Sequence, residues 1–207
     1  MNTLEDSPTL KTDQVSMKED LKFAQQVCAG AEGSFELLVD RWQGPLYQIS
    51  YRMSGNSHDA SDLTQEIFLL LYRKICSFDG RSTLSTWLHT VAMNCCRSGL
   101  RRIISRRNRE KNVLNDSIHE KETMLEPISP HPSPHDELEH KDRHKKIQQA
   151  ISALGIEFRE ALILRELHAM SYGQIAEVLG CSVGTVKSRI ARGRLKLKPL
   201  LEKGGVL

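Results

Sequence analysis

The sequence of 207 residues has few aromatic side chains, and several common patterns are missing from it. Aromatic residues make up 5% of the chain and hydrophobic residues 39%, a balance that suits a helix-rich protein. No apolar run approaches the roughly 18 residues that span a bilayer, and the N-terminus has no secretory signal pattern. Strand-like alternation of apolar and polar residues is also absent. We therefore expect a cytoplasmic, all-α protein without membrane insertion.

The five cysteines lack the CxxC spacing of common metal and redox sites. In a cytosolic protein such cysteines are most often buried apolar side chains, and we expect that role here for Cys28, Cys76, Cys95, Cys96 and Cys181. A zinc site would need His89, Cys95 or Cys96, and a further ligand from elsewhere. A Cys/His hydrolase would need a base-orienting group, and none is recognisable. We predict no metal, no cofactor and no catalytic residue.

Charge is distributed unevenly along the chain. The net charge of +3 is modest, so a surface for nucleic acid must be local. Residues 97–111 hold seven cations and one acid, and residues 182–198 hold six cations and no acid. Between them, residues 116–142 hold eight acids and two lysines. This order predicts two DNA-facing modules that are separated by a solvated connector.

Residues 171–198 form the clearest motif, two helices joined by a tight turn. Ser171 and Gln174 fit a capping box, Gly180 ends the first helix, and Ser182 can cap the second. Helical periodicity gives the second helix a buried side made of Val183, Val186, Ile190, Gly193 and Leu197. The opposite side carries Gly184, Ser188, Ala191, Arg192 and Leu195, with Lys187, Arg189, Arg194 and Lys196 on its flanks.

This opposite side is unusual for a solvated helix. Gly184 costs a helix about 1 kcal/mol relative to alanine, and it brings no visible folding benefit. Small side chains flanked by cations let a helix backbone approach the DNA major groove closely. A plain basic surface is the alternative, but caps, turn and periodicity agree on a helix-turn-helix that binds DNA.

The rest of the chain divides into helices and one linker. We expect a disordered tail over 1–17, helices near 21–28, 35–42, 45–51, 59–75 and 85–104, and further helices near 147–154 and 158–164. A break is expected at Pro45, and the arginine-rich end of the helix at 85–104 should fray. Residues 113–137 contain four of the seven prolines, so we interpret them as a linker. The predicted domains are then residues 18–112 and 138–207.

Two further segments of the first domain suggest binding. The helix at 59–75 shows Asp62, Gln65, Glu66, Leu69 and Tyr72 on the side away from its apolar stripe. That side is either a solvated polar face or a docking surface, and the apolar residues beside the acids favour docking. Residues 78–102 place a polar loop before a helix that carries Trp87, Asn94 and several arginines. Such groups can hold unpaired bases and phosphates, although Trp87 alone would be typical of a core.

With these residues assembled, the chain resembles an extracytoplasmic-function sigma factor of bacterial RNA polymerase, in the sigma-70 family. The resemblance covers about residues 20–110 and 140–200. It is carried by DASDLTQEIF at 59–68, FDGRSTLSTWLHTVAMN at 78–94, and FREALILRELHAMSYGQIAEVLGCSVGTVKSRIARGR at 158–194. Many members have an aspartate three or four residues after the asparagine that matches Asn94, whereas this chain has Arg97, Ser98 and Gly99 there.

The resemblance implies partners and roles. The first domain would dock on the β′ clamp helices of core RNA polymerase through Asp62, Gln65, Glu66 and Leu69. It would open the −10 promoter element through Phe78, Arg81, Ser82, Thr83, Trp87, Asn94, Arg97, Arg101 and Arg102. The second domain would contact the polymerase β flap and bind the −35 element through Thr185, Lys187, Ser188, Arg189, Ala191, Arg192 and Arg194. An anti-sigma factor is expected as a further partner.

The main alternative is a stand-alone helix-turn-helix regulator that binds operators as a dimer. Such a regulator would need a sensor domain or a dimerisation surface. Residues 1–110 show no recognisable ligand pocket and no phosphate-accepting pattern. The sequence thus favours a non-catalytic sigma factor, cytoplasmic and associated with the nucleoid when active.

Overall fold

The computed structural model describes residues 8–113 and 134–206, and no strand occurs within these ranges. The first unit contains α1 (Pro8–Cys28), α2 (Ser34–Ser54), α3 (Ser57–Lys74), the 3-10 turn η1 (Ile75–Ser77) and α4 (Leu84–Val113). The second contains α5 (Pro134–Ser152), α6 (Ile156–Leu162), the π-helical turn η2 (Ile163–Leu167), α7 (Tyr172–Leu179) and α8 (Val183–Lys203). The all-α prediction is confirmed. Most of the predicted linker, residues 114–133, lies outside the described ranges.

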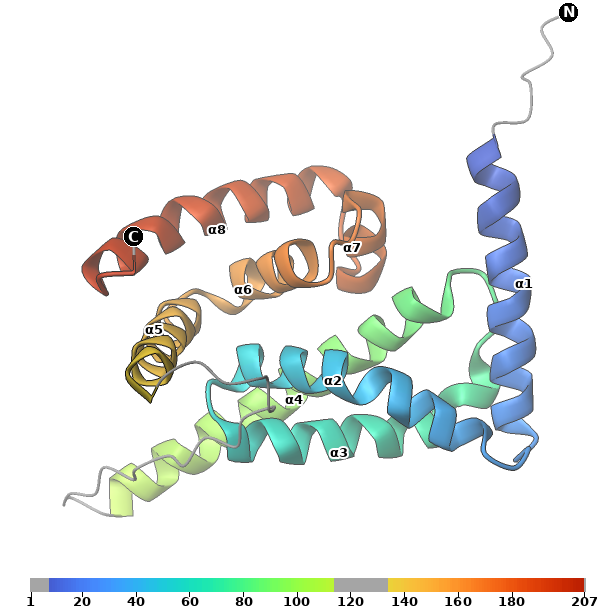
Figure 1. The fold of residues 1–207 in the computed structure, drawn as a ribbon, viewed down its shortest axis with the longest axis horizontal. Helices are drawn as coiled ribbons and strands as arrows, with labels where there is room; N and C mark the ends of the chain where they lie inside the picture. The colour runs from blue at the N-terminus through green and yellow to red at the C-terminus, as the bar shows by residue number, and fades with distance from the viewer. Residues whose placement is uncertain (1–7, 114–133, 207) are drawn as a thin grey trace, which may run out of the picture.

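The two units lie side by side (Figure 1). The second unit, coloured yellow to red, runs along one side of α2 and α4, while α1 stands at the far end of the first unit. None of the described helices is long and apolar enough to cross a membrane.

Three helix boundaries differ from the sequence-based prediction. The first helix, α1, begins at Pro8, although residues 1–17 were expected to be disordered. Proline suits the first turn of a helix, and residues 9–20 contain no glycine or further proline to interrupt it. Residues 105–113 likewise contain no glycine or proline, and α4 continues to Val113 instead of fraying near residue 104. The third difference is at α5, which begins at Pro134, inside the predicted linker.

Pro45 lies inside α2 and does not break it, contrary to prediction. Proline lacks an N–H group, so the helix loses one backbone hydrogen bond there. Leu38, before the proline, and Leu46 and Ile49, after it, are all fully buried. Their burial in one core holds both halves of the helix in line, and it outweighs the lost bond.

Gly99 allows α3 and α4 to approach closely in the first unit. A Cβ atom at this position would lie 2.2 Å from Cδ2 of Leu63, whose exposed fraction is 3%. Real Cβ atoms do not come so near a neighbour, so a larger residue would have to displace a packed side chain. The glycine that departs from the family pattern thus has a packing role.

The second unit confirms most of the helix-turn-helix prediction. Ser171 and Gln174 form a complete capping box, and Ser182 accepts a hydrogen bond from the Thr185 N–H at 3.1 Å. Val186, Ile190 and Gly193 are buried, as predicted from periodicity. Val183 is 42% exposed, so its predicted burial is wrong. It is the first residue of α8, at the edge of the packed unit.

The prediction for the cysteines is correct only in part. Cys95 and Cys96 are buried, and Cys181 is half-buried. Cys28 and Cys76 are exposed and joined by a disulfide, so their predicted role as buried apolar fillers is wrong. They are 48 residues apart in sequence, and only the tertiary fold places their Cα atoms 5.0 Å apart.

Two glycine substitutions test the helix packing. We expect Gly99→Ala to lower the free energy of unfolding by about 1–3 kcal/mol, because the added methyl overlaps Leu63. Gly184→Ala should raise it by up to about 1 kcal/mol, because the nearest atom, Oγ of Ser182, would lie at an ordinary 3.7 Å. Denaturant titration of both variants measures the difference. Equal stability of the two would contradict this account of Gly99.

Candidate nucleic-acid and partner interfaces

The outer face of α8 is a continuous, exposed surface. Lys187, Ser188, Ala191, Arg192 and Arg194 are exposed, while Thr185 and Arg189 are partly buried. Arg194 is paired with Glu166 at 2.6 Å, so it is held at the side of the helix. Arg192 has no ion pair with any residue in the described ranges and remains available to an external acceptor. The side of α8 that was predicted to read DNA is thus exposed, and its contact with DNA stays a prediction.

The face of α3 that was expected to bind a partner is also open. Asp62 and Gln65 are exposed, and Leu69 has 58% of its surface in solvent. Glu66 is partly covered because its carboxylate accepts a hydrogen bond from Arg102 of α4 at 2.5 Å. An exposed leucine between acidic and amide groups fits a partner surface that is both basic and apolar.

The loop between η1 and α4 is held in place by a buried aromatic contact at its start. Phe78 is only 6% exposed and packs against Trp87, with ring centroids 5.7 Å apart. Its predicted contact with DNA is therefore wrong for this structure: Phe78 is a core residue that fixes the start of the loop. Thr83 caps α4 by accepting a hydrogen bond from the Thr86 N–H at 3.2 Å.

The remaining predicted −10 residues lie on this loop and along α4. Arg81 is exposed and paired with Asp79 at 3.0 Å, and Ser82 is partly buried beside it. Asn94 and Arg101 are exposed, whereas Arg97 is partly buried. Arg97 donates a hydrogen bond to the side-chain oxygen of Asn94 at 3.1 Å. Loop and helix thus present polar groups together, but Arg97 is also engaged by the second unit.

Arg97 joins the two units through Glu160 of α6. Its Nε and Nη2 atoms donate to the two carboxylate oxygens at 2.5 and 2.9 Å. Glu160 is 3% exposed, and its hydrogen bond raises the pKa of Arg97. Bidentate, charge-assisted hydrogen bonds are stronger than neutral ones, and this pair is made only while the two units are together.

Arg159, the neighbour of Glu160, also contacts the first unit. Its guanidinium donates to the carbonyl oxygens of Met53 at 2.6 Å and Leu154 at 3.1 Å, and to that of Ser152. These carbonyls belong to the ends of α2 and α5, where backbone acceptors lack helical partners. Burial lowers the pKa of Arg159. Arg159 of α6 therefore links the C-terminal end of α2 to that of α5.

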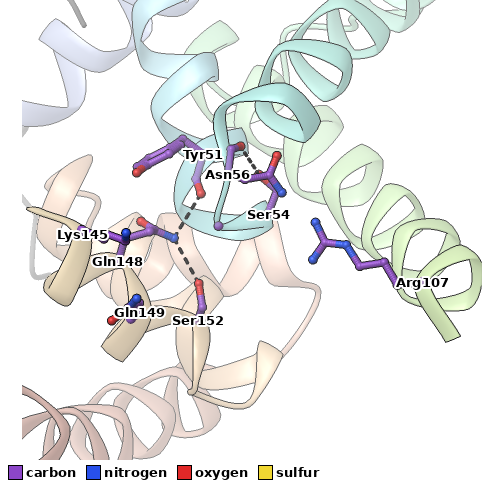
Figure 2. Close-up of a pocket in the computed structure, with 9 residues that line it drawn as sticks. Tyr51, Ser54, Asn56, Arg107, Lys145, Gln148, Gln149 and Ser152 are labelled. Atoms are coloured by element: carbon purple, nitrogen blue, oxygen red, sulfur yellow. Dashed lines mark hydrogen bonds between the residues drawn. The ribbon is translucent and has the colours of Figure 1, made fainter. Parts of the chain in front are cut away.

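A polar seam runs beside this contact (Figure 2). Gln148 of α5 donates to the carbonyl of Tyr51 and to Oγ of Ser152, both at 3.2 Å, and it accepts from Arg52 at 3.0 Å. A cavity of about 290 Å³ lies here, lined in part by the cations Arg107 and Lys145. This part of the interface is hydrogen-bonded, and buried apolar side chains of both units belong to one hydrophobic cluster.

A histidine pair completes the contact between the units. The rings of His89 in α4 and His168 after η2 are 4.8 Å apart, edge to face. Burial lowers the pKa of both, that of His168 to about 4, and the Nε2 atom of each is buried without a hydrogen bond. Both folded-state values lie below the usual 6.5, so the stability that depends on neutral rings is lost as the pH falls from about 6.5 toward 4.

Sequence reasoning missed every residue that the second unit contributes to this interface. Gln148, Arg159, Glu160 and His168 have no distinctive local pattern. An acid beside a base in the first turns of a helix is common on solvated surfaces. Only the packing of the second unit against α2 and α4 gives these side chains their partners.

Comparisons with known proteins identify the two units. The family description "Sigma-70 region 2" matches residues 38–107, and "Sigma-70, region 4" matches residues 144–197. The ECF RNA polymerase sigma factor SigW of Bacillus subtilis is 35% identical over 183 residues, which cover 87% of this chain and 95% of that protein. The sigma factor SigE of Mycolicibacterium smegmatis is 34% identical over 171 residues, covering 82% of this chain and 62% of that protein.

A solved structure agrees as well. The sigma factor RpoE of Bartonella quintana, in complex with the anti-sigma factor NepR, matches with a TM-score of 0.62 and 27% identity, over 82% of this chain and 98% of that one. Two regions match in the expected order, and the relatives align along most of the chain. The chain therefore belongs to the sigma-70 family, as an ECF-type RNA polymerase sigma factor.

Proposed function

We propose that the chain binds core RNA polymerase through α3, opens the −10 element with the loop and α4, and reads the −35 element with α8. The observation that carries this proposal is the presence, on one chain, of two separate open surfaces on the two matched regions. The contribution is binding energy and not catalysis. On this proposal the chain works in the cytoplasm, on the nucleoid when active.

The α3 face would dock on the β′ clamp helices. Asp62, Gln65 and Glu66 supply acceptors, and Leu69, one turn further along α3, supplies an exposed apolar anchor. Charged groups around an apolar anchor favour both rapid encounter and the correct register. The second unit would meet the β flap, and an anti-sigma factor would compete for these surfaces.

Promoter opening requires energy that base capture can offset. Separating DNA strands costs on the order of 1.4 kcal/mol for each stacked step. A base held against an aromatic or apolar wall contributes roughly 1–3 kcal/mol. The loop from Asp79 to Ser85, with Asn94, would receive one such base. Arg101 would hold phosphate and carry no sequence information, and Arg102 would do the same once it leaves Glu66.

The compact arrangement is then a resting state. Arg97 cannot contact phosphate while both carboxylate oxygens of Glu160 hold it. Twenty residues separate the described ends of α4 and α5, and a chain of that length reaches up to about 70 Å. Two turns of DNA span about 70 Å. Polymerase would therefore separate the units and place them on the two promoter elements.

Transcription distinguishes a sigma factor from the stand-alone regulator that the sequence alone left as the alternative. Added to core polymerase in a run-off assay, a sigma factor produces new promoter-specific starts. A regulator that acts alone changes only starts that already exist.

Charge reversal tests the polymerase surface. The double variant Asp62→Lys with Glu66→Lys should weaken binding to core polymerase by at least about tenfold, because cations replace acids at the contact. The control is Glu19→Lys with Glu32→Lys, which makes the same charge change at exposed positions away from α3. Affinity is measured by fluorescence anisotropy. Equal binding by both double variants would rule out this face.

Two arginine variants distinguish base-specific recognition by α8 from nonspecific binding of phosphate by α4. In the holoenzyme, Arg192→Ala should cost about 1–3 kcal/mol on a matched promoter and relax one base preference. Arg101→Ala should weaken binding evenly on matched and scrambled sites, and lower the slope of the salt dependence by about one. Binding titrations at several salt concentrations measure both. The same behaviour on both sites for Arg192→Ala would contradict the role of α8.

Glu160→Gln tests the resting state. The change leaves Arg97 without its charged partner at a buried contact, so the two units should separate and the radius of gyration of the free chain should increase. Binding of the free chain to promoter DNA should rise several-fold. Glu202→Gln is the control, because it breaks the exposed pair with Lys198 inside the second unit. If Glu160→Gln leaves the small-angle scattering unchanged, the Arg97–Glu160 pair does not hold the two units together.

A further inference from the structure

Cys28 and Cys76 form a disulfide on the surface of the first unit. Cys28 is the last residue of α1, and Cys76 is the central residue of η1. Both side chains are exposed, so a small molecule can reach either sulfur atom. In the cytoplasm, where polymerase acts, disulfides of most proteins are transient and serve catalysis or redox sensing.

The other cysteines differ from this pair in accessibility and in chemistry. Burial raises the pKa of the Cys95 thiol to about 11 and that of Cys96 to about 12. The thiolate is the reactive form, so both thiols are unreactive at neutral pH. Cys181 is half-buried, with the guanidinium of Arg189 3.8 Å from its sulfur. Cys28 and Cys76 are thus the accessible pair, whereas Cys95 and Cys96 are buried and Cys181 is half-buried and has no cysteine partner.

The disulfide lies where α1 supports the loop that precedes α4. The carboxylate of Asp20 accepts a hydrogen bond from the Leu84 N–H at 2.8 Å, at the end of this loop. The side chain of Leu21 lies against Gly80, near enough that a Cβ there would touch it at 3.4 Å. Phe78, two residues after Cys76, anchors the loop in the core. The crosslink thus fixes the end of α1 to the start of the loop.

We propose that Cys28 and Cys76 are a thiol–disulfide exchange site whose co-substrate is a small intracellular thiol and its disulfide. In reduction, the thiolate of one small thiol attacks one sulfur atom, and the other protein sulfur leaves as a thiolate. A second small thiol then attacks the mixed disulfide and releases the small-molecule disulfide. In sum, the protein disulfide and two thiols give two protein thiols and one small disulfide, and oxidation is the reverse.

The consequence for promoter opening rests on the function proposed above. When the disulfide is reduced, the end of α1 is tied to η1 by noncovalent contacts alone. The loop from Asp79 to Ser85 then loses part of its support and pays a greater ordering cost when it captures a base. Polymerase docking and −35 binding should not change, because α3 and α8 are not part of the crosslink.

The exchange chemistry is tested on the full chain without polymerase. The protein is equilibrated in buffers with a series of glutathione to glutathione disulfide ratios, quenched with acid, alkylated and analysed by peptide mass spectrometry. We expect Cys28 and Cys76 to gain and lose the label together, while Cys95 and Cys96 stay reduced throughout. Failure of the pair to form in any buffer, or stable mixed disulfides at each cysteine separately, would overturn the site.

The coupling is tested by transcription with chain whose redox state is set beforehand, so that polymerase meets no reagent. Oxidised chain should give about fivefold more open complex than reduced chain. Cys28→Ser and Cys76→Ser should both match the reduced level after either treatment, and Cys181→Ser should respond like the unaltered chain. Equal open-complex yields from oxidised and reduced chain would overturn the coupling. No specific transcripts in either state would instead refute the proposed sigma function, and the mass spectrometry result would stand apart.

Discussion

The ion pair between Arg97 and Glu160 joins the two halves of this molecule at a point nearly closed to water. Each partner belongs to a different unit, so the charges of both are compensated only while the units stay together. A buried charge without a partner is costly, whereas a pair replaced by contacts to DNA phosphate and water is not. This pair therefore holds the closed arrangement together, and on the proposed function Arg97 would exchange Glu160 for DNA phosphate.

The rest of the interface supports the same behaviour. Arg159 and Gln148 contact backbone carbonyls and amides, and a polar cavity lies between the units. Such groups find equivalent partners in water after separation, so their hydrogen bonds add little to the free-energy difference between the closed and open forms. The α3 face and the outer face of α8 remain exposed in the closed form. On the proposed function, polymerase would dock on α3 before the units move apart.

The first unit has a second point of control at its other end. There α1 braces the loop before α4 through Asp20, Leu21 and the bond between Cys28 and Cys76. The second unit holds one side of α4 through Arg97, and α1 holds the other end of the same surface. Promoter opening would then depend on two independent contacts, one of them ionic and one covalent.

Local chemistry explains what the sequence by itself determined. The capping box at Ser171, the turn at Gly180 and the periodicity of Val186 and Ile190 involve neighbours within a few residues, so they can be read from the chain directly. The open faces of α3 and α8 follow from the same periodicity. The tertiary structure alone decided that Pro45 stays inside a helix, that Phe78 is buried and that Cys28 meets Cys76. It also decided the pairing of Arg97 with Glu160, because such contacts join residues far apart in sequence and depend on how whole helices pack.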